Sequence, residues 1–406
     1  MHIAYFTNFY LPVVNGVVRS VQVFRDAFTA LGHNVFIFAQ EDDYEDSEPF
    51  IFRYPSLRLP IGVDIPTALP VSAFVDQLIP KLKLDVIHTH HPILLGQTAA
   101  TKARDYNLPL IFTFHTQYQE YTHYVPIPQE QVQEFIKSRV INWLRDYMRK
   151  CQHIIIPSES MRSILVNEYG LKDRYTVIPT GIDLTPYKKA NGAAIRSEWN
   201  WLDDKVIISV GRLAEEKNWV TLLNAVAIAQ KSQPNIRLVL LGEGPQADAL
   251  KQLTGELGIT DRVTFTGNVP FTEIPNYLKA ADLFTFASIT ETQGIVTLEA
   301  MAAGLPVVAV DGPGTKDILE DGKQGFLTQN DPQDLANGIL KLIENPSLMS
   351  KFKSAALRAS RAYDNMRLAR KMLKVYEQAI EDKKAKKYVT VEEETLQFPI
   401  VQRVNA

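Results

Sequence analysis

The sequence predicts an α/β protein with two doubly wound domains, each built on a parallel sheet. Short apolar runs rich in β-branched residues alternate with helix-length segments, and the alternation occurs in two successive series. Parallel strands covered by helices on both faces have such continuous apolar runs. The chain has 406 residues, more than one domain usually holds, so the two series are expected to form two domains.

The first series supplies the strands of an N-terminal domain that is expected to span residues 1–185. A helix from about Ser20 to Leu31 follows the first strand, and Gly32 stands where a helix C-cap belongs. The predicted strands are His2–Asn8, Asn34–Gln40, Asp85–His90, Leu110–His115, His153–Pro157 and Tyr175–Pro179.

The second series forms a C-terminal domain that is expected to span residues 186–375, after a polar linker at Asp183–Trp201. The amphipathic segment Ser347–Glu381 predicts one or two helices, and the last helices are expected to pack back on the N-terminal domain. Residues 383–406 carry a basic run and then an acidic one, and are expected to be poorly ordered. The predicted strands are Val206–Gly211, Arg237–Gly242, Val263–Gly267, Leu283–Ala287, Pro306–Val310 and Gly325–Thr328.

Composition excludes several classes of protein. The formal net charge of −3 provides no basic field, so a nucleic-acid partner is not expected. The single cysteine, Cys151, allows no disulfide within the chain and suits a reducing compartment. The N-terminus lacks the pattern of a signal peptide, and no apolar run approaches the roughly 18 residues of a spanning helix. We therefore expect a soluble or peripherally attached protein.

The most specific motif is SITETQGIVTLEAMAAGLP at Ser288–Pro306. It predicts a strand end, a polar loop and then a helix, whose free N–H groups can bind an anion such as a diphosphate. Glu291 lies in the loop and Glu299 in the helix, and carboxylates accept hydrogen bonds from vicinal hydroxyls of a sugar or ribose. An arbitrary pair of glutamates lies on the surface, but this strand–loop–helix context favours a binding site.

A second motif, VGRLAEEK at Val210–Lys217, follows another predicted strand. Arg212 offers a fork of hydrogen bonds and Lys217 a point charge, which together suit a diphosphate. The alternative is a solvated turn in which Glu215 and Glu216 pair with both cations. Its place at the carboxyl end of a strand favours binding, because ligands of α/β proteins bind there.

The Glu-x7-Glu pattern followed by AMAAGLPVVA resembles the signature of glycosyltransferase family four. The resemblance covers nearly the whole chain up to about residue 380 and implies a retaining enzyme with the GT-B fold, in which two Rossmann-like domains face each other across a cleft. It further implies that Glu291 binds the donor hexose, that Glu299 binds the ribose and that Arg212 and Lys217 bind the diphosphate. His115, in FTFHTQYQEY, resembles the histidine that contacts the transferred sugar, so the predicted catalytic residues are His115, Glu291, Arg212 and Lys217.

Further donor contacts are expected at glycine-containing turns. Gly16 stands where many relatives have a second glycine beside it, LGEGP supplies Gly242 and Glu243, and FTGNVP resembles the stretch that reads the nucleobase through backbone atoms. An ordinary Asn-Gly or Gly-x-Gly turn is the alternative at the first two positions. The predicted donor-binding set is Gly16, Arg212, Lys217, Gly242, Glu243, Val269, Glu291, Gln293, Gly294, Ile295, Val296 and Glu299.

The segments THHPILLGQTAA and FTFHTQYQEYTHYVP resemble a subgroup that glycosylates diacylglycerol or its glycolipids. The resemblance implies a UDP-sugar donor, a lipid acceptor and a cytoplasmic enzyme attached peripherally to a membrane. The predicted helix Gln131–Lys150 combines aromatic and basic residues and suits an anionic membrane surface, although a core-packed helix with a basic face is equally compatible. The predicted acceptor or membrane contacts are Tyr118, Tyr121, His123, Trp143, Arg145 and Arg149. A soluble sugar or metabolite is the alternative acceptor.

No metal or cofactor is expected. Five of the eight histidines lie between His88 and His123, but their spacing fits no usual zinc site, because no cysteine is near and Glu120 is the lone carboxylate in the loop with His115 and His123. The chain also contains no Asp-x-Asp sequence that would hold manganese or magnesium. The histidines are therefore predicted to line the cleft as polar groups at strand ends.

Overall fold

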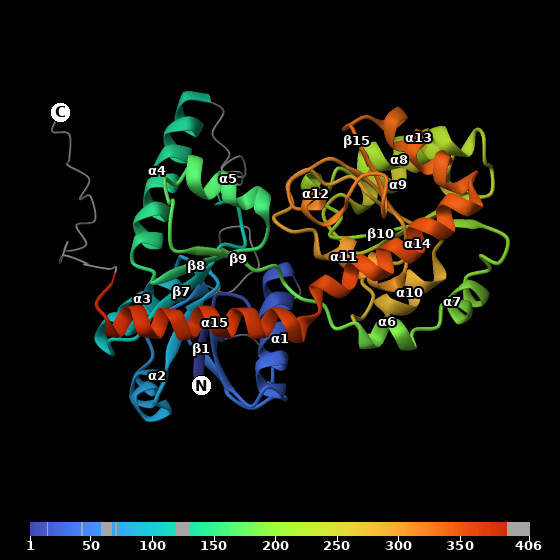
Figure 1. Cartoon of the computed structure of the whole chain (residues 1–406). Coiled ribbons are helices and arrows are strands. Elements are labelled where there is room, and N and C mark those ends of the chain that lie inside the picture. The colour runs from blue at the N-terminus through green and yellow to red at the C-terminus, as the bar shows by residue number, and fades with distance from the viewer. Residues whose placement is uncertain (14, 42–43, 58–66, 70, 119–129, 388–406) are drawn as a thin grey trace.

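In the computed structural model, residues 1–13, 15–41, 44–57, 67–69, 71–118 and 130–387 are described. They form two parallel sheets in two domains that lie side by side, each with helices on both faces of its sheet (Figure 1). This arrangement confirms the predicted fold class, an α/β protein with two Rossmann-like domains.

The first sheet has the strand order β3-β2-β1-β6-β7-β8-β9, with every neighbouring pair parallel. β1 lies near the centre, where Ile3 pairs with Val35 of β2 on one side and with Val86 of β6 on the other. The strands are β1 (His2–Thr7), β2 (Asn34–Gln40), β3 (Ile51–Tyr54), β6 (Val86–Thr89), β7 (Leu110–Thr113), β8 (His153–Ile156) and β9 (Tyr175–Val177). A separate antiparallel pair joins β4 (Ser56–Leu57) to β5 (Thr67–Ala68).

The second sheet has the order β12-β11-β10-β13-β14-β15 and is also parallel throughout. Its six strands fall within or next to the six predicted runs of the C-terminal half. They are β10 (Lys205–Val210), β11 (Ile236–Leu241), β12 (Val263–Phe265), β13 (Leu283–Phe286), β14 (Val307–Val310) and β15 (Gly325–Thr328).

The first helix of the N-terminal domain, α1, buries one apolar stripe. In α1, Asn15 caps the first turn by accepting a hydrogen bond from the Val18 N–H at 2.9 Å, and Val21, Phe24 and Phe28 then face the sheet at intervals of three and four residues. The helices are α1 (Gly16–Ala30), α2 (Ala73–Leu78), η1 (Ile79–Leu82), α3 (Leu95–Asp105), α4 (Glu130–Arg149) and α5 (Glu159–Asn167).

The C-terminal half contains more and shorter helices. Those up to α14 cover its sheet, and none of the helices in the described ranges is long and apolar enough to cross a membrane. They are α6 (Thr185–Lys189), α7 (Gly192–Glu198), η3 (Glu215–Lys217), α8 (Trp219–Gln230), α9 (Ala247–Glu256), η4 (Thr260–Arg262), α10 (Ile274–Ala280), α11 (Ile295–Ala303), α12 (Thr315–Ile318), α13 (Pro332–Ile343), α14 (Pro346–Ser360), η5 (Arg361–Tyr363) and α15 (Asn365–Lys384).

The last helix crosses from the second domain to the first. α14 packs against α11, whereas α15 lies along the N-terminal domain and contacts α1 (Figure 1). Met372 and Tyr376 join the core of that domain beside Phe28, because the Phe28 and Tyr376 rings stand 5.7 Å apart. α15 runs to Lys384, so it extends slightly into the predicted tail, and residues 388–406 lie outside the described part.

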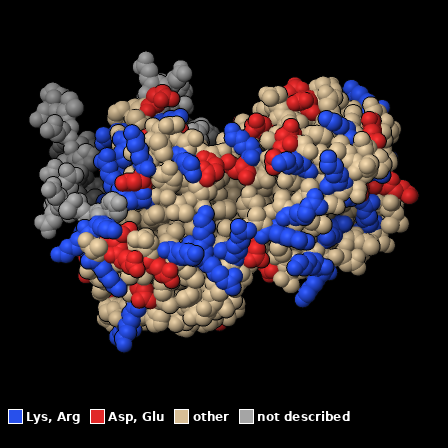
Figure 2. Space-filling view, in the orientation of Figure 1, with Lys and Arg blue, Asp and Glu red and all other residues tan. Residues whose placement is uncertain are grey.

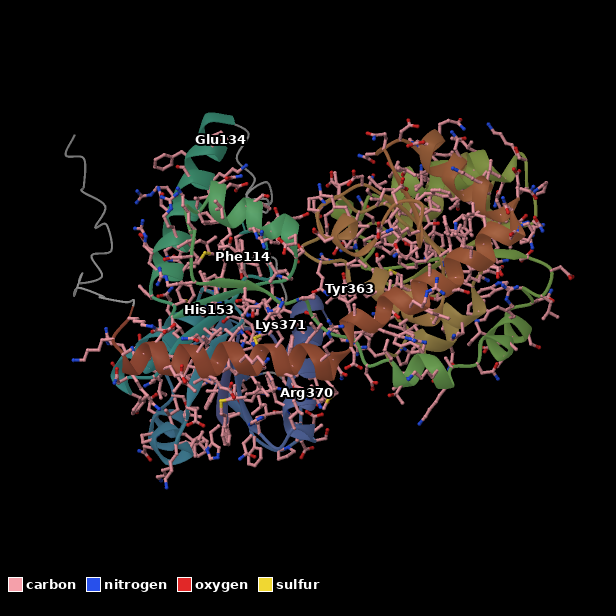
Figure 3. The ribbon with its side chains drawn as sticks, in the orientation of Figure 1. Phe114, Glu134, His153, Tyr363, Arg370 and Lys371 are labelled. Carbon is pink, nitrogen blue, oxygen red and sulfur yellow. The ribbon has the colours of Figure 1, made fainter. Side chains whose placement is uncertain are left out.

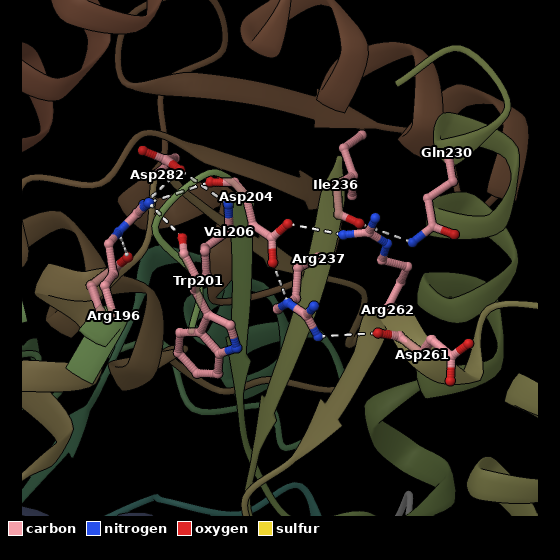
Figure 4. Close-up of polar contacts among 11 residues, drawn as sticks. Arg196, Trp201, Asp204, Val206, Gln230, Ile236, Arg237, Asp261, Arg262 and Asp282 are labelled. Carbon is pink, nitrogen blue, oxygen red and sulfur yellow. Dashed lines mark hydrogen bonds and ion pairs between the residues drawn. The ribbon is translucent and has the colours of Figure 1, made fainter. Parts of the chain in front are cut away.

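A polar network fastens the amino ends of the strands in the second sheet (Figure 4). Asp204, just before β10, accepts hydrogen bonds from Arg237 of β11 and from Arg262 at 2.9 Å. Arg196 of α7 donates to Asp282 at 2.7 Å. Ligands of parallel sheets bind at the carboxyl ends of strands, so this network at the opposite ends holds the domain together.

Candidate active site

Loops at the carboxyl ends of β10 and β13 bring a lysine and a glutamate together. Lys217, at the end of η3, forms an ion pair with Glu291 in the loop that follows β13. The hydroxyl of Ser288 donates a hydrogen bond to the same carboxylate oxygen at 3.0 Å. Both charged side chains are mostly buried, so their attraction is weakly screened by solvent.

The loop that carries Glu291 also contacts the N-terminal domain. Its next residue, Thr292, donates its hydroxyl hydrogen to the carbonyl oxygen of His115 at 2.9 Å. The loop that carries Glu291, paired with Lys217, therefore contacts the His115 backbone across the domain boundary. Arg212 lies exposed in the loop between β10 and η3, where its carbonyl oxygen accepts a hydrogen bond from the Trp219 indole at 2.9 Å.

Three histidines stack beneath this site. The ring centroids of His88 and His90 are 4.5 Å apart, and those of His90 and His115 are 5.2 Å apart. His90 Nδ1 lies 2.9 Å from His115 Nε2, and His88 bonds Thr113 and Tyr376 through its two nitrogens. The stack thus connects β6, β7 and α15.

Burial holds these rings neutral at physiological pH. It lowers the pKa of His88 to about 3, and it lowers the pKa of His115 and His90 well below the ordinary value, with the neighbouring histidines adding to the effect. His115 can therefore form hydrogen bonds without carrying a charge. Among the residues that the structure describes, no three His, Cys, Asp or Glu side chains are grouped so as to hold a metal ion.

The N-terminus of α11 opens toward the same site. Gly294 precedes the helix in the left-handed conformation (φ 74°), which favours glycine, and no side chain in the described ranges caps this end. Ile295 and Val296 start the helix, so their backbone N–H groups lack partners within it. This end of α11 can therefore bind an anion.

Gln293 has a different role from the donor contact that the sequence predicted. Its buried amide forms two hydrogen bonds with the backbone of Thr180, accepting from the Thr180 N–H at 2.7 Å and donating to the Thr180 carbonyl at 2.9 Å. The Thr180 hydroxyl donates to Ser20 of α1 at 2.8 Å. The amide is therefore occupied within the protein, at the segment that connects the two domains.

Glu299 lies inside α11 and is 4% exposed. Arg19 of α1 donates to its carboxylate at 3.3 Å, and the Tyr187 hydroxyl also bonds it. Burial raises the pKa of Glu299, and Arg19 and Tyr187 oppose that rise. Sequence reasoning missed Arg19 and Tyr187. The only signal for Arg19 is its position one turn after Gly16 in the same helix.

The predicted glycines differ in what surrounds them. A Cβ added to Gly16 would have no other atom within 4 Å, whereas a Cβ on Gly242 would lie 2.1 Å from the carbonyl oxygen of Gly211. Gly242 is therefore required by packing within the protein, and Gly16 faces open space. Glu243 is exposed and accepts a hydrogen bond from Asn268 at 2.8 Å, and Val269 packs against the core of the second domain.

The predicted acceptor and membrane residues lie on and near α4. Trp143 is 38% exposed, and Arg149 is exposed with Asp146 at 3.6 Å. Arg145 donates to the carbonyl oxygens of Glu168 and Tyr169, so the structure gives it a packing role that the sequence did not predict. Tyr118 is half-buried against the core of the N-terminal domain, and Tyr121 and His123 lie outside the described residues.

The two α/β domains, with their parallel sheets and the site between them, define a protein of the GT-B fold class. The structure of Anabaena Alr3699/HepE in complex with UDP and glucose has the same fold, with a TM-score of 0.74 at 20% identity over 93% of this chain and 100% of that one. Residues 14–186 match the family model Glycosyltransferase Family 4, and residues 193–359 match Glycosyl transferases group 1.

The chain belongs to glycosyltransferase family four. It is 34% identical to an alpha-monoglucosyldiacylglycerol synthase of Streptococcus pneumoniae over 360 residues, which cover 86% of this chain and 80% of the relative. It is 30% identical to an alpha-monoglucosyldiacylglycerol synthase of Acholeplasma laidlawii over 378 residues, which cover 89% of this chain and 93% of that relative.

Proposed function

We propose that this glycosyltransferase moves a hexose, glucose or galactose, from a UDP-sugar to a hydroxyl of diacylglycerol or of a monoglycosyl-diacylglycerol, with retention at the anomeric carbon. The observation that carries the proposal is the loop at residues 288–294, which joins Lys217, Glu291 and the N-terminus of α11 to His115 of the other domain. Two relatives that match most of the chain are alpha-monoglucosyldiacylglycerol synthases, which supports the lipid acceptor.

The site offers groups for each part of the donor. Arg212, Lys217 and the N-terminus of α11 would stabilise the negative charge that develops on the diphosphate as it leaves. Glu291, now paired with Lys217, would accept hydrogen bonds from hexose hydroxyls, and Glu299 would accept those of the ribose. Neutral His115 would contact the transferred sugar.

The bond changes follow from this placement. The acceptor oxygen attacks the anomeric carbon on the face from which the phosphate oxygen departs, and that phosphate oxygen takes the proton of the acceptor hydroxyl. No side chain is assigned as a general base or as a nucleophile. The protein's contribution is a fixed arrangement of positive charge and N–H groups around the leaving diphosphate.

A cationic face supports attachment to an anionic membrane. Residues 346–376 contain eight basic residues and one acidic residue, and Lys and Arg side chains gather over α14 and α15 on the face shown in Figure 2. Arg370 and Lys371 extend from α15, and Tyr363 lies at the junction of the domains (Figure 3). A groove of about 500 Å³ here is lined by Ala362, Arg367, Leu368, Arg370, Lys371 and Lys374. Basic side chains clustered on one surface in this way attract anionic lipid headgroups.

Exposed aromatic side chains on α4 add an apolar element. Phe135 is 64% exposed and Trp143 is 38% exposed, and aromatic residues favour the membrane–water interface. Together with the cationic face, they support a cytoplasmic enzyme that binds the inner surface of a membrane peripherally.

The proposal is tested by incubating the purified enzyme with labelled nucleotide-sugars and either a total lipid extract in vesicles or a set of soluble sugars. Mass analysis of the products is expected to show a hexose on diacylglycerol or on a monoglycosyl-diacylglycerol, formed from a UDP-sugar and unchanged by EDTA. Products on soluble acceptors alone would replace the lipid proposal with the alternative acceptor class. If no glycosylated product formed with the lipids or with the soluble sugars, the transferase proposal would be contradicted for both classes of acceptor.

A further inference from the structure

Arg19 links the two domains at a position that no motif predicted. It lies in the first turn of α1, and its guanidinium donates to the carboxylate of Glu299 in α11 at 3.3 Å. The same guanidinium stands 4.7 Å from the centroid of the Phe271 ring. The Arg19 side chain is 27% exposed, whereas that of Glu299 is 5% exposed. A partly exposed cation of one domain thus contacts a buried carboxylate of the other.

Two other helices supply hydrogen-bonding groups to Glu299. Arg19 reaches it from α1, and Tyr187 of α6 bonds it through the phenol hydroxyl. Without a cation, a carboxylate buried this deeply would favour its neutral form. A neutral carboxyl group would offer ribose hydroxyls fewer acceptor positions than a carboxylate does.

The contact with Phe271 locates Arg19 beside the segment expected to bind the nucleoside. It directly follows the FTGNVP stretch, which resembles the stretch that reads the nucleobase, and Glu299 is the residue proposed for the ribose. Arg19 of the N-terminal domain therefore contacts residues on both the ribose side and the nucleobase side of the proposed site. A carboxylate has about four lone-pair positions, so one hydrogen bond each from Arg19 and Tyr187 leaves two positions for the ribose hydroxyls.

We propose that Arg19 is a positioning residue of the nucleotide site, which holds the Glu299 carboxylate in place as the acceptor for the ribose hydroxyls. The inference rests on the proposed function, in which Glu299 binds the ribose. It also means that the nucleotide site, although built on the C-terminal domain, is complete only when the N-terminal domain is closed over it.

The test measures UDP binding by calorimetry between pH 5.5 and 8.5, with the wild-type protein and with R19M, R19K, E299Q and the double variant R19M/E299Q. R19M is expected to weaken UDP binding roughly tenfold at pH 7.5, the size expected for losing support from one charge-assisted hydrogen bond. R19M should also move the acidic limb of the pH profile of UDP binding to higher pH. Without Arg19 the pKa of Glu299 rises, so the carboxylate takes up its proton at a higher pH. R19K retains the charge and should restore most of the profile.

The double variant separates positioning from a direct or merely structural contact. Because Arg19 acts through Glu299, R19M/E299Q should bind UDP no more weakly than E299Q, and both should lose the Glu299-dependent limb. A further loss of affinity in the double variant would overturn the proposal, as would R19M binding UDP like the wild type. If the wild-type protein bound no UDP, or E299Q left binding unchanged, the failure would lie in the proposed function.

Discussion

Replacing His91 by asparagine should make the N-terminal domain less sensitive to acid. His91 Nδ1 accepts a hydrogen bond from the Asn8 N–H at 3.1 Å and lies 3.3 Å from the Thr7 hydroxyl, so this nitrogen must remain unprotonated in the folded state. Burial lowers the pKa of His91 to about 3. The side-chain oxygen of asparagine can accept the same hydrogen bond and does not titrate.

The magnitude follows from proton linkage. In the unfolded chain histidine has a pKa of about 6.5, so below that pH the unfolded state binds a proton that the folded state does not. The stability that neutral His91 contributes is therefore fully present above the pKa of the unfolded chain, about 6.5. It is lost as the pH falls from there toward the pKa of the folded state, about 3. Each such histidine lowers the free energy of unfolding by up to about 1.4 kcal/mol per pH unit, and His88 contributes in the same direction.

Two carboxyl groups act in the opposite direction. Burial raises the pKa of Glu299 and Asp26, so the folded state takes up protons before the unfolded state at these positions. Both groups are present in the wild type and in H91N, so their effect cancels when the two pH slopes are compared. Unperturbed carboxylates titrate near pH 4, below a window from pH 5 to 6.5. In this window H91N should reduce the pH slope of the unfolding free energy by about 1 kcal/mol per unit.

Hydrogen exchange of peptides from β1 and β6 reports the free energy of opening of this domain alone, after correction for the pH dependence of intrinsic exchange. Peptides from β11 in the other domain serve as an internal reference and should show the same slope in both proteins. If H91N and the wild type had equal slopes in β1 and β6, the reasoning from the buried neutral ring would be refuted, whatever the variant did to stability at neutral pH.

Three shorter predictions concern other positions. G16A should raise the donor KM at least roughly tenfold in steady-state assays, because the added methyl group would meet only a ligand, and melting temperature should not fall. R212A should lower kcat by about 100-fold without changing the melting temperature, since Arg212 is exposed and is proposed to stabilise the leaving diphosphate. D204N should destabilise the protein by about 1–3 kcal/mol in urea unfolding through its bonds to two arginines, while UDP affinity stays unchanged.

The sequence predicted the sheets well because each central strand is a continuous apolar run of its own. β3 escaped prediction because it is an edge strand of four residues in which Arg53 interrupts the apolar pattern. The Arg53 guanidinium donates to the carbonyl of Leu11 at 2.9 Å and pairs with Asp46, contacts that only the folded chain creates. Short edge strands of mixed polarity carry little periodic signal.

The site was predictable to the extent that its residues belong to local motifs. Lys217 and Glu291 each follow a strand, and the carboxyl ends of parallel strands meet at one edge of the sheet. The contact between Arg19 and Glu299 joins residues 280 positions apart, and no periodicity specifies it. Gln293 was placed with the donor because it lies inside a binding motif, and only the packing of the domains directs its amide toward Thr180.

The contact between Gln293 and Thr180 predicts that the donor loop depends on the segment between the domains. That segment is itself anchored, since Ile182 pairs with Asp364 where the chain returns toward α15. Q293L would leave the N–H and the carbonyl of Thr180 buried without partners, at a cost of roughly 1–3 kcal/mol for each. We expect lower thermal stability and a lower kcat, because the neighbouring Glu291 and the N-terminus of α11 would lose their support.

Q293E separates the hydrogen bonds from the volume of the side chain. A glutamate carboxylate accepts from the Thr180 N–H but cannot donate to the Thr180 carbonyl, whereas a protonated carboxyl group can do both. Burial favours the protonated form, so the activity of Q293E relative to the wild type should rise as the pH falls from 8 to 6. Q293L should show no such rise, because its side chain does not titrate. A flat ratio for Q293E would mean that the amide merely fills space and that the donor loop is held by other contacts.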